Sequence, residues 1–226
     1  MTNWQTTKTT DGGEMSLYIA RPNQAPKGGI LIFQEIFGVN QHIKEVTEKF
    51  ASLGLLAVAP DLFHRSQPRF AEEDYTNNAK GREYMQNYTS AHMSYDIEAA
   101  YKWLRNELGN DNIAASGYCL GGKLAFLANA TQPLKCAISY YGNLGSIIEQ
   151  AKNQHGPLLM CWGGKDEHLG LDMPHQVVKE LKSAGKTFTN AIFSDAGHGF
   201  FCDKRDAYNP AAAKQSWALV KEFLAQ

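Results

Sequence analysis

The chain has 226 residues, of which 22 are Lys or Arg and 23 are Asp or Glu, so its formal net charge is −1. Because neither sign of charge dominates, no overall field attracts nucleic acid or an anionic membrane surface, and we expect neither as a partner. A chain of this length can bury one sizeable core, so we expect a single domain over residues 1–226.

The cysteines and the apolar stretches indicate a cytoplasmic protein. The four cysteines lie far apart and form no C-x-x-C pair, which favours reduced intracellular thiols over disulfides. No apolar stretch approaches the roughly 20 residues that span a bilayer, and the N-terminus lacks the apolar core of a signal peptide. We expect a monomer or a weak homodimer.

Short apolar runs, most of them bounded by Gly, Pro, Asn or Asp, predict buried strands. In chain order these runs cover residues 15–20, 29–34, 55–59, 113–116, 136–140, 158–162 and 187–193. Apolar residues at helical spacing follow at 43–53, 177–181 and 210–226, whereas the polar residues 67–87 predict an irregular excursion. Alternating strands and helices predict an α/β fold with a mostly parallel central sheet and helices on both faces.

A carboxylate follows the second of these strands. Glu35 stands at the strand end, ahead of a Gly-containing loop and a helix. Two interpretations stay open, a surface or salt-bridged carboxylate and a group that regulates when a nearby thiol ionises.

The strand at 113–116 leads into Gly117-Tyr-Cys119-Leu-Gly121 and then into a predicted helix. This G-x-C-x-G pattern is typical of the nucleophile elbow of α/β-hydrolases, a sharp turn that requires small neighbours. The turn places the Cys119 sulfur near the positive end of the helix, which favours the thiolate. The alternative is a buried cysteine in a Gly-rich turn, but the strand before and the helix after favour a nucleophile.

An elbow nucleophile in this fold requires an acid and then a histidine further along the chain. Asp166 and His198 supply this order, and each lies just past a predicted strand. Glu167 and His168 are rivals for the place of Asp166. We predict that His198 holds and transfers the thiol proton while Asp166 fixes its tautomer and stabilises the imidazolium.

Two backbone N–H groups are expected to stabilise the negative oxygen that forms during attack. In this fold one comes from the loop after the strand that ends at Glu35, which is Ile36, and the other from the residue after the nucleophile, which is Leu120. The side chains at these positions say little about the role.

Several motifs together resemble the dienelactone hydrolase family, the carboxymethylenebutenolidases. They are Gln34-Glu-Ile-Phe-Gly-Val-Asn40, Ala59-Pro-Asp-Leu-Phe63, Gly117-Tyr-Cys-Leu-Gly-Gly122, Tyr140-Tyr-Gly142 and Gly197-His198. The resemblance runs over essentially the whole chain and implies an α/β-hydrolase, without cofactor or metal, that opens unsaturated lactones through a Cys-His-Asp triad. It further implies that Glu35 holds the thiol at rest and takes its proton when an anionic substrate arrives, and that Tyr140 lines the substrate pocket.

The chain departs from the family at the substrate carboxylate, which two arginines grip in the classical enzyme. Cys202 stands where the second of these is expected, and Arg205 is displaced. Arg82 is the candidate for the first, with a solvated helix residue as the alternative. A missing arginine would cost at least one charge-assisted hydrogen bond, roughly 1.5–3 kcal/mol, so another lactone or ester is expected to be preferred over dienelactone.

Three functions therefore stay open. The leading hypothesis is a thiol hydrolase of small lactones or esters that passes through an acyl-cysteine. The second is a general carboxylesterase or thioesterase on the same scaffold, and the third is a non-catalytic protein of this fold in which Cys119 is a redox sensor.

Overall fold

The computed structural model describes residues 2–226, and Met1, with which the predicted domain and the N-terminal stretch begin, lies outside the described residues. The chain divides into two compact units, with the boundary between Ser116 and Gly117. One domain over the whole chain stays a prediction.

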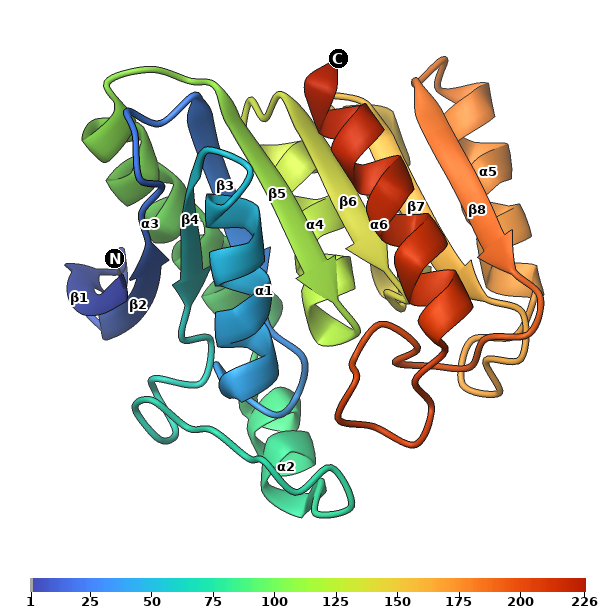
Figure 1. Ribbon diagram of the computed structural model, residues 1–226, viewed down its shortest axis with the longest axis horizontal. Coiled ribbons are helices and arrows are strands. Elements are labelled where there is room, and N and C mark those ends of the chain that lie inside the picture. The colour runs from blue at the N-terminus through green and yellow to red at the C-terminus, as the bar shows by residue number, and fades with distance from the viewer. Residues whose placement is uncertain (1) are drawn as a thin grey trace. The chain divides into compact units, whose positions relative to one another are not determined.

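The first unit is built on strands in the order β1-β2-β4-β3-β5, drawn from blue to green in Figure 1. The strands are β1 (Thr2–Lys8), β2 (Glu14–Ala20), β3 (Gly28–Phe33), β4 (Leu55–Pro60) and β5 (Ile113–Tyr118), and the helices are α1 (Gln41–Ala51), α2 (Ala79–Asn87) and α3 (Ser90–Leu108). β1 pairs antiparallel with β2 and β2 antiparallel with β4, while β3 and β4 are parallel.

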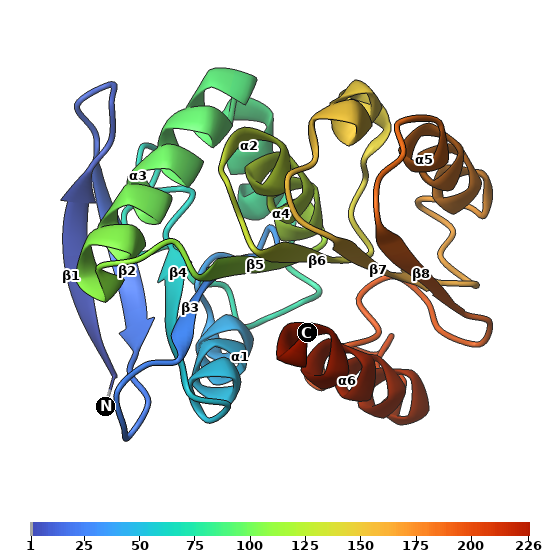
Figure 2. The same cartoon turned by 90° about the horizontal axis from the view of Figure 1, so that it is seen from above.

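Helices cover both faces of the inner strands of this unit. Figure 2 shows α3 on one face and α1 on the other. All six residues of β3 are buried for this reason, which explains why its sequence is apolar without alternation. The end of β3 leads directly to Glu35 and the loop that precedes α1.

The second unit is built on β6 (Cys136–Tyr140), β7 (Leu158–Gly163) and β8 (Phe188–Phe193), which pair in parallel in that order. Its helices are α4 (Leu120–Thr131), a 3-10 helix η1 (Gly145–Asn153), α5 (Asp172–Ser183) and α6 (Pro210–Ala225). Figure 2 places α4 and α5 on one face of these strands and α6 on the other.

The predicted alternation of strands and helices is confirmed, and each predicted strand is present with its ends shifted by at most two residues. One prediction was wrong in part, and the strand β1 and the helix α3 were not among the predicted elements. β1 was missed because it is a polar edge strand, and the excursion at 67–87 is irregular only in its first part, since Ala79–Asn87 forms α2. Gly81 is the buried residue of α2, so the sequence carries no apolar stripe to reveal the helix.

No helix within residues 2–226 combines the length and the apolar character needed to cross a membrane.

Candidate active site

Cys119 lies at the single-residue turn between β5 and α4 and has a left-handed backbone, with φ 54° and ψ −113°. A residue other than glycine with positive φ is strained by about 1–3 kcal/mol and persists only where its surroundings fix it. Here the Cys119 N–H donates to the Tyr140 carbonyl at 3.0 Å, and the Gly122 N–H donates to the Cys119 carbonyl at 3.0 Å. The turn therefore holds Cys119, which is partly exposed, at the end of a strand.

Gly117 and Gly122, on either side of Cys119, are required by close packing. A side chain on Gly117 would overlap the carbonyl oxygen of Gly121. A Cβ atom on Gly122 would lie 2.6 Å from the Tyr140 oxygen and 2.9 Å from the Gly142 Cα atom. Both approaches lie below ordinary van der Waals contact, so only glycine lets α4 begin against the end of β6.

His198 and Asp166 lie in contact although they come from loops after different strands. Nδ1 of His198 lies 2.8 Å from Oδ2 of Asp166, and the side chains are 14% and 2% exposed. The other carboxylate oxygen accepts the N–H groups of His168 at 2.9 Å and Leu169 at 3.2 Å. Both oxygens of Asp166 are thus engaged, which fixes the carboxylate and orients the imidazole.

His198 and Asp166 each favour the charged form of the other. Burial alone would lower the pKa of His198, but hydrogen bonds to the Asp166 and Cys119 side chains, together with the attraction of their charges, raise it to about 10. Burial alone would raise the pKa of Asp166, but the hydrogen bond and charge of His198 hold it below its usual value. At neutral pH the site therefore contains an imidazolium beside a carboxylate.

The rivals of Asp166 occupy other positions. Glu167 is exposed to solvent. The ring of His168 lies 5.3 Å from the His198 ring, edge to face, so it is a neighbour of the histidine rather than its hydrogen-bond partner.

The two adjacent tyrosines after β6 have different surroundings. Tyr140, the predicted pocket tyrosine, is fully buried; its ring stacks on Tyr118 and lies tilted against Phe201, both at 4.9 Å between centroids. Tyr141 has φ 39°, and its ring lies 5.0 Å from that of His198. Substrate binding by Tyr140 stays a prediction, while Tyr141 is the tyrosine beside the imidazole, a neighbour that sequence reasoning missed.

The structure also places Arg82, which was predicted to bind the substrate carboxylate, and Cys202 and Arg205, which lie near the position where the family's second arginine is expected. Cys202 is fully buried. Arg205 folds back so that its guanidinium lies over Gly199, the residue after His198, and a side chain on Gly199 would overlap it. Arg82 is exposed on α2, and its Nε atom donates to Asn78 Oδ1 at 3.1 Å. These surroundings are those of a solvated helix residue.

The remaining predicted residues divide between the units. Glu35 is 1% exposed and Ile36 follows it, both in the first unit. Leu120 is the first residue of α4 in the second unit, so its N–H belongs to the unbonded first turn of a helix. The regulatory role of Glu35 and the oxyanion roles of Ile36 and Leu120 stay predictions. Within residues 2–226 no group of three or more His, Cys, Asp or Glu side chains is arranged to hold a metal ion.

Comparison with known proteins places this chain among hydrolases. The model of the dienelactone hydrolase family matches residues 15–226. A protein of Synechocystis sp. named "Putative carboxymethylenebutenolidase" is 31% identical, over 91% of this chain and 89% of its own length. A protein of the same name from Yersinia pestis is 28% identical, over 98% of this chain and 87% of its own length.

A solved structure supports the same placement. A "Putative Dienelactone Hydrolase" from Klebsiella pneumoniae matches with a TM-score of 0.87 at 27% sequence identity, over 100% of this chain and 99% of that one. The α/β-hydrolase fold predicted from the sequence is therefore confirmed.

Proposed function

Because the chain belongs to the dienelactone hydrolase family of carboxymethylenebutenolidase-like ester hydrolases, we propose that it opens small lactones or esters through Cys119, His198 and Asp166. The observation that carries this proposal is the His198–Asp166 contact of 2.8 Å, joined to a pKa of His198 that Asp166 and Cys119 raise to about 10. An imidazolium at neutral pH stabilises the negative charge of a thiolate, which is the attacking form of cysteine.

In the acylation step the Cys119 sulfur attacks the carbonyl carbon of the substrate, and the electron pair of the C=O bond moves onto oxygen. The N–H groups of Ile36 and Leu120 are proposed to stabilise this oxyanion. When the C=O bond re-forms, the bond to the ring or ester oxygen breaks, and His198 gives that oxygen its proton. The product of this step is an acyl-cysteine beside a neutral imidazole.

In the deacylation step water attacks the same carbon, and the neutral His198 takes a proton from it. Collapse of the second oxyanion breaks the bond to sulfur, which releases the carboxylic acid and restores the thiolate and the imidazolium. Asp166 keeps Nδ1 of His198 protonated throughout, so that Nε2 is the nitrogen that exchanges protons.

Arg205 suggests the charge of the preferred substrate. Its guanidinium lies over Gly199, directly after the proposed base, and so brings a permanent positive charge next to the reacting region. We propose that the substrate carries a negative group, such as a carboxylate, for this arginine to bind.

The test compares wild type with Cys119→Ala, Cys119→Ser and His198→Ala on dienelactone, on anionic esters and on p-nitrophenyl esters. Cys136→Ala is the matched control, because burial raises the pKa of that thiol to about 11 and it is not a nucleophile at neutral pH. We expect turnover to be lost in Cys119→Ala and His198→Ala and kept in Cys136→Ala, with an acyl adduct on Cys119 detected by mass spectrometry. Wild-type turnover in Cys119→Ala would exclude the proposal, and activity confined to p-nitrophenyl esters would indicate a general esterase.

A further inference from the structure

One part of the excursion lies against the loop that contains Ile36. We call residues 70–75 the brace and residues 36–40 the loop; in Figure 1 the chain between β4 and α2 passes the start of α1. The Glu72 N–H donates to the Phe37 carbonyl at 2.9 Å. The Tyr75 and Phe37 rings meet edge to face at 4.7 Å, so both backbone and side chains join the brace to the loop.

Gly38 makes this approach possible. It forms an isolated antiparallel bridge with Ala71 and has φ +77°. A side chain there would overlap the carbonyl oxygen of Phe70, which is backbone and cannot move aside easily. The close contact between the loop and the brace therefore requires glycine at position 38.

Asn40 connects the brace to a helix as well. The residue is 1% exposed, and its Oδ1 atom accepts the Ile43 N–H at 3.3 Å, which caps the start of α1. Its Nδ2 atom donates to the Glu72 carbonyl at 3.0 Å and to the Tyr75 hydroxyl at 2.8 Å. Ser, Thr and Asp also cap helices, but an amide is the group that caps and donates twice from the same side chain.

The far end of the loop is held by α2. A side chain on Gly81 would overlap the Ile36 carbonyl oxygen, so the first turn of α2 lies directly on that peptide group. The peptide group between Ile36 and Phe37 thus lies between Asn40 with its brace and the beginning of α2, and the Ile36 N–H is on the other side of the same Cα atom. A backbone N–H group stabilises an oxyanion most when its direction is fixed before the reaction. If the N–H group had to reorient during the reaction, the free-energy cost of that movement would offset the stabilisation of the oxyanion.

We propose that Asn40 is a positioning residue for the oxyanion hole, which acts by holding the brace against the loop and so fixing the direction of the Ile36 N–H. This inference rests on the proposed function, and it assigns to the excursion the task of shaping the loop. Asn40 touches no reacting atom, so it acts through Ile36.

The experiment removes the amide donors but keeps the cap. Asn40→Asp keeps an oxygen for the Ile43 N–H and loses both N–H donors, and Asn40→Ser replaces the amide by a shorter hydroxyl that can still cap but has one donor in place of two, without adding charge. Asn77→Ser is the matched control, because Asn77 lies in the same excursion and its amide donates to the Glu72 carboxylate at 2.8 Å rather than to α1 or the loop, and serine adds no charge beside that carboxylate. Each variant is assayed for kcat and KM on an ester, for iodoacetamide alkylation of Cys119 and for Tm.

We expect both Asn40 variants to lower kcat about 10- to 100-fold with KM within about twofold. A displaced oxyanion donor stabilises the transition state less but does not change the binding of the substrate. Alkylation should keep its wild-type rate, because displacement of iodide forms no oxyanion, and Asn77→Ser should keep the wild-type kcat.

Unchanged kcat in Asn40→Ser would overturn the inference, as would equal losses in turnover and alkylation, which indicate general damage. Neither result depends on Cys119→Ala, whose loss of turnover tests the proposed function separately.

Discussion

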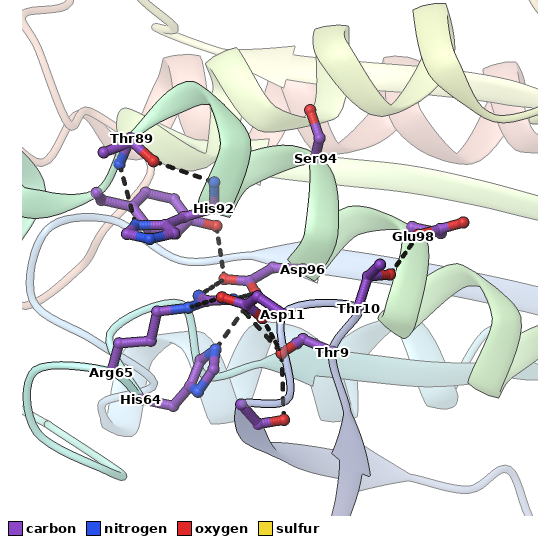
Figure 3. A network of polar contacts seen from close by, with 12 residues as sticks. Thr9, Thr10, Asp11, His64, Arg65, Thr89, His92, Ser94, Asp96 and Glu98 are labelled. Carbon is purple, nitrogen blue, oxygen red and sulfur yellow. Dashed lines mark hydrogen bonds and ion pairs between the residues drawn. The ribbon is translucent and has the colours of Figure 1, made fainter.

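Residues 2–226 contain two histidine–aspartate pairs, one in each unit, and the pairs differ in what surrounds the carboxylate. In the second unit His198 Nδ1 lies 2.8 Å from Asp166, and in the first unit His64 Nε2 lies 3.2 Å from Asp96. Figure 3 shows that the Asp96 carboxylate is shared among several side chains. The two geometries are alike, so a histidine beside an aspartate does not by itself mark a catalytic site.

The difference lies in the source of positive charge. The Arg65 guanidinium donates to Oδ2 of Asp96 at 3.0 Å and forms an ion pair with Oδ1 at 2.9 Å, and the Tyr88 hydroxyl donates to Oδ2 at 2.9 Å. Arg65 also binds Asp11 in the turn between β1 and β2, so this network ties the turn to α3. Asp166 is held by His198 and by two backbone N–H groups. The positive charge beside this carboxylate is therefore that of the His198 imidazolium. Asp166 raises the pKa of the His198 imidazole, which allows His198 to hold the proton that it later transfers.

The largest expected effect separates the two aspartates. Asp166→Asn should lower kcat by roughly 10⁴-fold, because the imidazole loses the partner that fixes its tautomer. Asp96→Asn should leave kcat near the wild-type value but lower the free energy of unfolding by about 1–3 kcal/mol, because an amide NH2 group replaces a buried oxygen that accepts hydrogen bonds, while Arg65 keeps its second partner, Asp11. Steady-state kinetics and urea unfolding of both variants measure the contrast. A similar loss of kcat in the two would show that the pairs do not differ in role.

A second, smaller effect is expected in the pH dependence of stability. The pKa of His198 is raised from 6.5 to about 10 in the folded protein, so its contribution to stability is complete below pH 6.5 and is lost as pH rises through 10. The unfolding free energy of wild type should therefore fall towards that of His198→Gln between these pH values. A constant difference between the two proteins from pH 6.5 to 10.5, measured by urea unfolding, would contradict the charged imidazole.

The smallest expected effect concerns Arg205. Arg205→Met should weaken binding of a carboxylate-bearing ester by about 1.5–3 kcal/mol, a rise in KM of about 10- to 100-fold, because one charge-assisted hydrogen bond is lost. KM for a neutral ester of the same size should stay within about twofold. Equal changes for the two substrates would show that the arginine is structural rather than selective.

The sequence predicts those features whose signal is local. Buried parallel strands appear as apolar runs, and the elbow appears as glycines around Cys119, because these constraints act within a few residues. β1 was missed because Thr2–Lys8 is polar and becomes a strand by pairing with β2. α2 was missed because its position is fixed by the contact between Gly81 and Ile36, which lies far along the chain.

The side chains around His198 could be predicted only in part. The order of nucleophile, acid and histidine can be seen in the chain, and Asp166 and His198 do lie in contact. Which tyrosine faces the imidazole depends on the turn of the backbone at Tyr141, with its φ of 39°, and no sequence pattern encodes that angle. The fold-back of Arg205 depends likewise on the path of a loop after β8.

The packing of Arg205 on Gly199 also makes these two positions mutationally dependent on each other. Gly199 has φ +82°, and a methyl group there would displace the guanidinium, which as the end of a flexible side chain moves at little cost. Gly199→Ala should therefore already remove most of what Arg205 contributes, and adding Arg205→Met to it should change little more. The effects of the two substitutions would then not be additive. During divergence, a substitution of Gly199 would remove the selection that keeps arginine at position 205.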